Sequence, residues 1–382
     1  MPSWIHAVGT SVPPYAYHQE YALACMKGWL KDRVLARMAH SVYRQSGIEQ
    51  RFSVLPDFQP DAEPILFTQD AQGTLGNPST GERNRMYEQS FARLASSAAK
   101  AAFDRARHLK PAEVTHVITV SCTGFTNPGP DLAIVQWCGI PLTAERYHLG
   151  FMGCYAAFPA LRLADQICRA NPKAVVLVVC IELCTLHLQL RPTTDSILAN
   201  SLFADGAAAV LLAGVPGPTG GGWMMDGFAT EVLSEGEADM AWTIGDHGFD
   251  MVLSSYVPRL LDARAAEVVE RMLNRLEVDP LEVKAWAIHP GGKAILDAME
   301  KNLACPLDDS REVLKRYGNM SSATVLFVLE RMMQAPCRPG HRIGALAFGP
   351  GITVELGCFR FAKIDEEMNS CLRATPSQGL GV

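Results

Sequence analysis

Apolar residues along the chain fall into two patterns: short, fully apolar runs and longer stretches with helical periodicity. The apolar runs predict buried strands at residues 4–12, 114–121, 174–181 and 207–213, and further on at 224–230, 283–288, 343–348 and 353–359. Helical periodicity predicts helices at residues 19–46, 86–108, 131–138, 257–276, 294–303 and 321–333. Strands that alternate with helices indicate an α/β fold, and the second half of the chain repeats the first.

Three segments without periodicity divide the chain. Residues 214–222 hold two prolines and five glycines, which predicts a boundary between a first half at 1–214, opened by a helical cap, and a second half at 223–365. Residues 55–85 predict a long surface loop. Residues 366–382 carry no pattern, so we expect a disordered tail.

Composition narrows the class of protein. The 382 residues are 48% hydrophobic with a formal net charge of −6, so the chain lacks the basic surface that nucleic-acid binding requires. No apolar run approaches the ~18 residues of a membrane span, and no secretory signal is expected. Eleven cysteines without a CxxC pair or a Cys/His cluster indicate reduced thiols rather than a metal site, which favours a cytoplasmic location.

A cysteine stands where a short apolar strand meets a long helical pattern, in residues 149–158. The spacing of Ala160, Leu163 and Ile167 predicts that Cys154 lies in the first turn of a buried helix. The positive end of a helix dipole favours a thiolate, which attacks thioesters. Because most cysteines are inert core residues, a nucleophile also requires a base and an oxyanion donor elsewhere in the fold.

Two polar residues of the second half fit those roles. His289 follows the apolar run 283–288, so its ring is expected at the carboxyl edge of the sheet. Asn319 precedes the apolar helix at 321–333, where an ordinary N-cap is the alternative role. If the halves stack about a two-fold axis, Cys154, His289 and Asn319 converge. Such a set is suited to acyl transfer from a thioester followed by carbon–carbon bond formation.

Five sequence blocks resemble the chalcone and stilbene synthases, the type III polyketide synthases of the thiolase fold. The resemblance covers nearly all of the chain and rests on residues 153–164, 202–209, 289–297, 317–323 and 348–355. It implies two similar α/β halves stacked as αβαβα. It also implies that Cys154 takes a starter acyl group from coenzyme A, while His289 and Asn319 bind thioester carbonyls and promote decarboxylation of malonyl-CoA. No metal or bound cofactor is implied.

The resemblance also assigns a substrate pocket, which includes cavity phenylalanines and residues that control cyclisation. The matching positions are Phe203, Phe249, Thr123, Glu182, Ser321, Met240, His187 and Asn127. The last three depart from plant enzymes, where glycine, threonine and a methionine that reaches into the partner subunit's cavity are usual. A reshaped pocket, and a run at 245–249 like that of bacterial members, imply an aliphatic starter and an alkylpyrone or alkylresorcinol product.

The sequence leaves several functions open. A ketoacyl synthase of the fatty-acid type uses the same three residue types but receives its extender from acyl carrier protein. A synthase with an aromatic starter, of the chalcone or stilbene type, is a second alternative. A catalytically inactive thiolase-fold subunit that binds acyl groups is the third, although all three polar residues are retained.

Two binding predictions complete the sequence-based picture. The family pairs through the first half, so we expect a homodimer, with the segment at residues 123–129 beside the interface. Coenzyme A carries phosphates, and Arg37, Arg44 and Arg51 on or after the first helical region are candidates to bind them, with solvated surface charge as the alternative.

Overall fold

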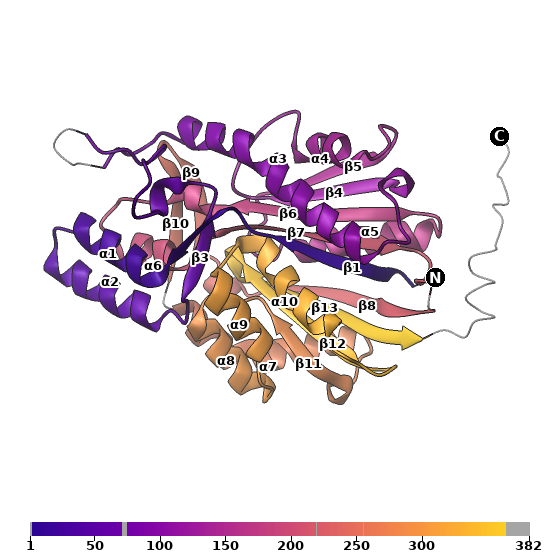
Figure 1. Ribbon diagram of the computed structural model, residues 1–382. Coiled ribbons are helices and arrows are strands. Elements are labelled where there is room, and N and C mark those ends of the chain that lie inside the picture. Colours follow the sequence, from indigo (N-terminus) through magenta and orange to yellow (C-terminus); the bar gives the residue numbers. More distant parts are fainter. Residues whose placement is uncertain (1, 71–74, 219, 255, 364–382) are drawn as a thin grey trace.

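The computed structural model describes residues 2–70, 75–218, 220–254 and 256–363 (Figure 1). The first half contributes β1 (Trp4–Ser11), β4 (His116–Ser121), β5 (Glu145–Gly150), β6 (Val175–Leu183), β7 (Asp205–Ala213), α3 (Thr80–Arg105), α4 (Pro130–Cys138) and α5 (Ala157–Ala170). The second half contributes β8 (Gly221–Val232), β11 (Val283–Ile288), β12 (Arg342–Gly349), β13 (Thr353–Lys363), α7 (Tyr256–Arg275), α8 (Lys293–Leu303), α9 (Asp308–Tyr317) and α10 (Thr324–Gln334).

Smaller elements gather at one end of the molecule, at the left of Figure 1. They are the helices α1 (Gln19–Trp29), α2 (Arg33–Gln45) and α6 (Thr194–Leu202), the strand pair β2 (Tyr15–His18) and β3 (Gln50–Ser53), and the hairpin β9 (Met240–Gly245) and β10 (Gly248–Leu253).

The two halves share one pattern of strands. Within the described residues, a nine-stranded sheet has the order β11-β12-β13-β8-β1-β7-β6-β4-β5. The antiparallel pairs β1·β7 and β6·β7 correspond to β8·β13 and β12·β13, and the parallel pair β4·β6 corresponds to β11·β12. The halves meet at β1 and β8 through only two residue pairs, Trp4 with Met224 and Ile5 with Trp223. The predicted repeat is therefore present in the topology.

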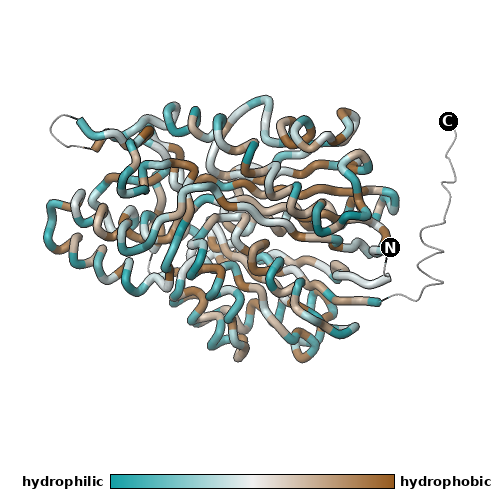
Figure 2. Tube along the Cα trace, viewed as in Figure 1, coloured by the Kyte–Doolittle hydropathy of each residue, from teal (hydrophilic) through white to brown (hydrophobic). Residues whose placement is uncertain are grey.

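Among the described residues, three hydrophobic cores pack the five layers of the fold against one another. One core lies between α3, α4 and the strands of the first half, and a second lies between α7, α8 and the strands of the second half. The third contains α5 and α10, which are packed between the strands of both halves. Figure 2 shows that strands which contribute side chains to these cores carry many hydrophobic residues. This αβαβα arrangement confirms the predicted fold class. The runs at β6 and β7 are fully buried, as strands covered on both faces must be.

Several predicted segments differ from the structure. Helix α3 begins at Thr80, six residues before the predicted start, because Ser79 and Glu82 form a capping box. The predicted surface loop before it buries Leu55 and Phe67 in the core beside α3. Five further features of the structure were not predicted from the sequence: α6, α9, β2, β3 and the β9–β10 hairpin. The predicted tail at 366–382 lies outside the described residues.

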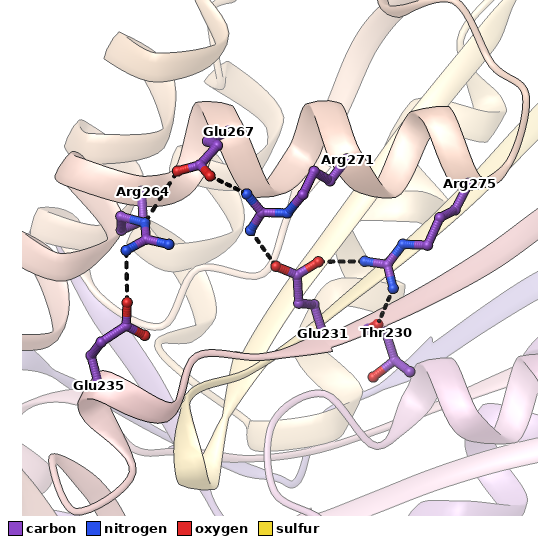
Figure 3. A network of polar contacts seen from close by, with 7 residues as sticks. All are labelled: Thr230, Glu231, Glu235, Arg264, Glu267, Arg271 and Arg275. Carbon is purple, nitrogen blue, oxygen red and sulfur yellow. Dashed lines mark hydrogen bonds and ion pairs between the residues drawn. The ribbon is translucent and has the colours of Figure 1, made fainter.

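Charged side chains fix α7 against the end of β8 (Figure 3). Glu231 of β8 pairs with Arg271 and Arg275 of α7, and Arg271 also pairs with Glu267. Individual exposed ion pairs contribute little, but Glu231 is mostly buried and shared by two guanidinium groups. The network holds the orientation of α7, whose first turn reaches the cavity described below.

The contact between β1 and α3 gives a test of the fold. A Cβ atom on Gly9 would lie 2.2 Å from the backbone nitrogen of Ala102, and backbone atoms cannot move aside as a side-chain tip can. We expect Gly9→Ala to lower the free energy of unfolding by about 3 kcal/mol in denaturant titrations. Gly28→Ala is the matched control, because no atom lies within 4 Å of that Cβ. It should leave stability unchanged or raise it by up to about 1 kcal/mol. Equal effects would show that the contact is not close.

Candidate active site

A cavity of about 580 Å³ opens between the two halves and the smaller elements at the end of the molecule. Cys154, His289 and Asn319 all line it, although they are far apart in the sequence. The volume is in the range of small-molecule sites. The structure therefore brings these three residues to one cavity, as predicted.

The turn that presents Cys154 is not helical. Helix α5 begins at Ala157, so Cys154 lies in the turn before the helix, and its predicted place in the first helical turn is wrong. Gly153 has φ of +85°, and a Cβ atom there would lie 2.4 Å from Cδ of Pro350. Glycine is therefore required immediately before the cysteine, both for its backbone and for the approach of the second half.

His289 follows β11, and its backbone N–H donates to the carbonyl oxygen of Leu346 at 2.7 Å. The side chain is 1% exposed, and neither ring nitrogen has a hydrogen-bond partner among the described residues. Burial lowers the pKa of His289 to about 3, so the imidazole is neutral. An unpartnered buried imidazole that lines a cavity is free to exchange protons with a bound substrate.

Asn319 is held by the first half through its backbone. Its N–H donates to the carbonyl oxygen of Leu202 at 2.9 Å, and its carbonyl oxygen accepts from the N–H of Ala204 at 2.8 Å. The side-chain Oδ1 accepts from the N–H of Ser321 at 2.9 Å and from the Cys154 thiol at 3.9 Å. Asn319 therefore lies before a short 3-10 helix at Ser321–Ala323 rather than capping α10.

Burial favours the thiol form of Cys154, whereas a helix dipole alone would favour the predicted thiolate. Burial raises the pKa of Cys154 to about 11, an effect that the contacts with Ser321 and Asn319 only partly offset. The residue retains some exposed surface and lines the cavity. Desolvation by the apolar walls outweighs the helix dipole here. Cys154 and His289, which both line the cavity, are thus both neutral.

Glu182 does not line the cavity, contrary to the resemblance-based prediction. It is fully buried behind the cavity wall, where it accepts hydrogen bonds from the Cys122 N–H at 3.0 Å, from the Thr123 hydroxyl at 3.1 Å and from the Ser322 hydroxyl. The first two donors belong to the first half and the third to the second half. Burial raises the pKa of Glu182 to about 7.

The other predicted pocket residues divide between the cavity and its surroundings. Those that line the cavity are Phe203, Phe249, Thr123, His187, Met240 and Ser321. Asn127 does not line the cavity of its own chain and is exposed on the segment after β4. Its predicted reach into a partner's cavity stays a prediction.

Two of these residues carry fixed polar groups. The Thr123 hydroxyl donates to Glu182 and accepts from the N–H of Leu183, so it offers little to a substrate. His187 donates through Nε2 to the Thr123 carbonyl oxygen at 2.8 Å and stacks on Phe249 with ring centroids 3.6 Å apart. Burial lowers the pKa of His187 to about 3, so the ring is a neutral part of an aromatic wall.

The arginines predicted to bind coenzyme A are placed differently. Arg51 lines the cavity, but it is 2% exposed and donates to two backbone carbonyl groups, one of them that of Phe203 at 2.7 Å, so its guanidinium is engaged in holding the wall. Arg44 is exposed and paired with Glu20. Arg37 is exposed on α2, and neither it nor Arg44 lines the cavity.

Sequence reasoning missed much of the cavity wall. The missed lining residues come from α1, α2, α6 and the β9–β10 hairpin and include Tyr21, Cys25, Trp29, Val42, Leu198, Trp242, Met251 and Leu253. The exposed cations Lys293 and Arg259 also line the cavity. The apolar residues on a second face of α1 were the sequence signal that could have identified this part of the wall. Among the described residues, no group of three or more His, Cys, Asp or Glu side chains could hold a metal ion, and no helix is long and apolar enough to cross a membrane.

The chain is similar to proteins of known family. The family model for chalcone and stilbene synthases, N-terminal domain, matches residues 2–216, and the model for the C-terminal domain matches residues 226–361. The alpha-pyrone synthesis polyketide synthase-like Pks18 of Mycobacterium tuberculosis is 34% identical over 64% of this chain and 65% of its own. The chain thus spans just under two thirds of that relative's length.

Two further proteins are similar over nearly the whole chain. The 3,5-dihydroxyphenylacetyl-CoA synthase of Streptomyces toyocaensis is 28% identical over 92% of this chain and 88% of its own. The crystal structure of PKS-I from the brown alga Ectocarpus siliculosus superposes with a TM-score of 0.88 at 27% identity, over 95% of this chain and 98% of that chain.

The buried carboxyl of Glu182 predicts a pH dependence of stability. Its pKa of about 7 in the folded protein exceeds the ordinary value of 4.5, so the folded state holds a proton that the unfolded chain has lost. Its contribution is fully present below pH 4.5 and is lost as the pH rises to about 7. The free energy of unfolding of the wild type, relative to that of Glu182→Gln, should fall by about 3 kcal/mol across this window. A constant difference between the two proteins would contradict a protonated Glu182.

Proposed function

Because this chain belongs to the family of chalcone and stilbene synthases, we propose that it is a type III polyketide synthase that extends an aliphatic acyl starter with malonyl-CoA and cyclises the product to an alkylpyrone or alkylresorcinol. One observation supports this most strongly: Cys154, His289 and Asn319 line a single cavity, although two of them come from the second half and one from the first. The cavity walls are otherwise mostly apolar.

Loading of the starter begins with Cys154 and His289 both neutral. His289 takes the thiol proton of Cys154 as the sulfur attacks the thioester carbonyl of the starter, and the coenzyme A thiolate leaves with that proton. The acyl group remains on Cys154 as a thioester. The lack of a hydrogen-bond partner on either ring nitrogen of His289 supports this role, because no protein group competes for the proton.

Extension requires the same polar groups. Malonyl-CoA loses carbon dioxide, and the resulting enolate attacks the acyl carbon on Cys154, which releases the cysteine sulfur and leaves a chain longer by two carbons. In this step the amide of Asn319 and the imidazole of His289 donate to the thioester oxygen on which negative charge develops, and the presence of both groups in the cavity lining supports these roles. Coenzyme A then carries the extended chain for the next cycle.

The lining supports an aliphatic starter. Met240, Met251, Leu198 and Leu253 supply unbranched or flexible apolar surface, which adapts to an alkyl chain. The name of Pks18 links that relative to alpha-pyrone synthesis, which supports lactone closure in this proposal. The exposed Lys293 and Arg259 take the place of the predicted arginines as candidates to receive the coenzyme A phosphates.

A homodimer is part of the proposal. Strand β5 forms an edge of the sheet, and its first four residues are exposed. Large apolar side chains are exposed beside it, with Trp137 at 62% and Leu142 at 80%. A bare edge strand next to exposed apolar groups favours pairing with a second copy.

The catalytic roles can be separated by three variants. Cys154→Ala should abolish covalent labelling by acyl-CoA, and His289→Ala should lose both labelling and condensation because the thiol loses its base. Asn319→Ala should retain labelling and lower malonyl-CoA decarboxylation by about 100-fold. Mass spectrometry of the intact protein and release of labelled carbon dioxide measure the two steps. Labelling of Cys154→Ala, or normal decarboxylation by Asn319→Ala, would refute the respective role. Lack of turnover with malonyl-CoA as extender would favour the carrier-dependent alternative.

Chain-length dependence tests the starter. Each buried methylene contributes about 0.8 kcal/mol, so kcat/KM should rise about fourfold per methylene of the acyl-CoA until the cavity is full. Met240→Trp should end this rise at a shorter chain. Thr243→Trp, an exposed position on the same strand, should leave the profile unchanged. A flat profile, or a preference for an aromatic starter, would contradict the aliphatic proposal.

Sedimentation tests the dimer. The wild type should sediment as a species of twice the 41.6 kDa chain mass at micromolar concentration. Trp137→Glu combined with Tyr147→Glu should shift it to the monomer, because charge would be buried at the edge of β5. Leu281→Glu, at a position that is 78% exposed on another face, is the control and should stay dimeric. A monomeric wild type would refute this part of the proposal.

A further inference from the structure

The helices α1 and α2 form a hairpin that projects from one end of the molecule (Figure 1). Leu23 and Met26 of α1 pack against Ala39 and Tyr43 of α2. A neighbouring face of α1 lines the cavity from near the start of the helix to its last residue, Trp29. At 1.5 Å per residue, the stretch from residue 21 to residue 29 spans about 12 Å. The cavity therefore reaches the turn of the hairpin.

The turn carries a local excess of positive charge. Residues 27–37 contain Lys27, Lys31, Arg33 and Arg37 against one acidic residue, Asp32, in a chain whose formal net charge is −6. All four cations are exposed. The Asp32 carboxylate accepts from the N–H groups at the start of α2, at 2.6 and 3.0 Å, so it serves as the N-cap of that helix. These cations flank Trp29 in the sequence, so the turn of the hairpin carries a positive patch next to the end of the cavity that Trp29 lines.

Apolar side chains accompany the charge. Val34, in the first turn of α2, is 71% exposed, and Trp29 and Leu30 are only partly covered. Cations alone would suit an acidic protein. Cations around exposed apolar groups are typical of elements that lie on an anionic membrane, where the apolar groups enter the boundary of the acyl chains.

We propose that the α1–α2 hairpin docks on an anionic lipid surface, where it brings the apolar cavity next to the phase in which long acyl chains dissolve. The proposal deepens the proposed function, because it rests on an aliphatic substrate or product. An alkyl chain could then pass between the lipid and the cavity along the face of α1 that ends at Trp29. The docking itself depends only on the hairpin and is measured without turnover.

Vesicle co-sedimentation of the full chain tests the docking. The wild type should sediment with vesicles of phosphatidylcholine and phosphatidylglycerol, remain in solution with phosphatidylcholine alone, and be released by salt. Lys31→Glu combined with Arg33→Glu should weaken binding at least about tenfold, since each basic residue near such a surface contributes substantially. Val34→Asp should weaken it independently. Arg107→Glu combined with Lys173→Glu, exposed positions away from the hairpin, is the matched control and should bind as the wild type does.

Turnover of a short, soluble acyl-CoA separates this proposal from the proposed function. The hairpin variants should retain that turnover, which shows that they are folded and active. If the wild type ignores anionic vesicles, or the control variant loses as much binding as the hairpin variants, docking is refuted while the synthase activity stands. Selective loss of turnover with a starter carried on acyl carrier protein, without any vesicle binding, would assign the hairpin to an acidic protein and also refute the lipid surface.

Discussion

The backbone pairing of Asn319 with residues 202–204 sets the register between the two halves of the active site. Cys154 belongs to the first half and Asn319 to the second, so the position of Asn319 beside Cys154 depends on two hydrogen bonds that cross from one half to the other. The same boundary contains Gly153 against Pro350 and the buried Glu182, which accepts from donors of both halves. A change that loosens this boundary would separate the nucleophile from the amide without touching either.

Buried guanidinium groups shape the walls of the cavity without entering its chemistry. Arg51 donates to carbonyl oxygens at Asn200 and Phe203, and Arg83 donates to those of Leu186 and Leu188. Both carbonyl-bearing segments line the cavity. Burial lowers the pKa of Arg83 to about 10, but the group stays charged at neutral pH. Loops that would otherwise present unpaired carbonyl groups are thus held in one conformation, which leaves the cavity surface apolar.

The sequence predicts the repeated strands well, and the three polar residues that it brings forward line one cavity, because both follow from local pattern. Buried strands are continuous apolar runs, and His289 and Asn319 stand at the ends of such elements. The β9–β10 hairpin was missed because its inner side chains pack on residues far away in the sequence, Trp242 on Phe151 and Phe249 on His187. The protonation of Cys154 and the burial of Arg51 could not be predicted either, since both depend on walls that only the tertiary structure assembles.

The raised pKa of Cys154 is shared by the other cysteines that the structure describes. Burial raises the pKa of each of the ten cysteines that the structure describes, all of which are free. Oxidation to sulfenic acid and reaction with alkylating agents proceed through the thiolate. Raised pKa values lower the fraction of thiolate at neutral pH, and with it the rate at which peroxide oxidises these side chains, Cys154 included.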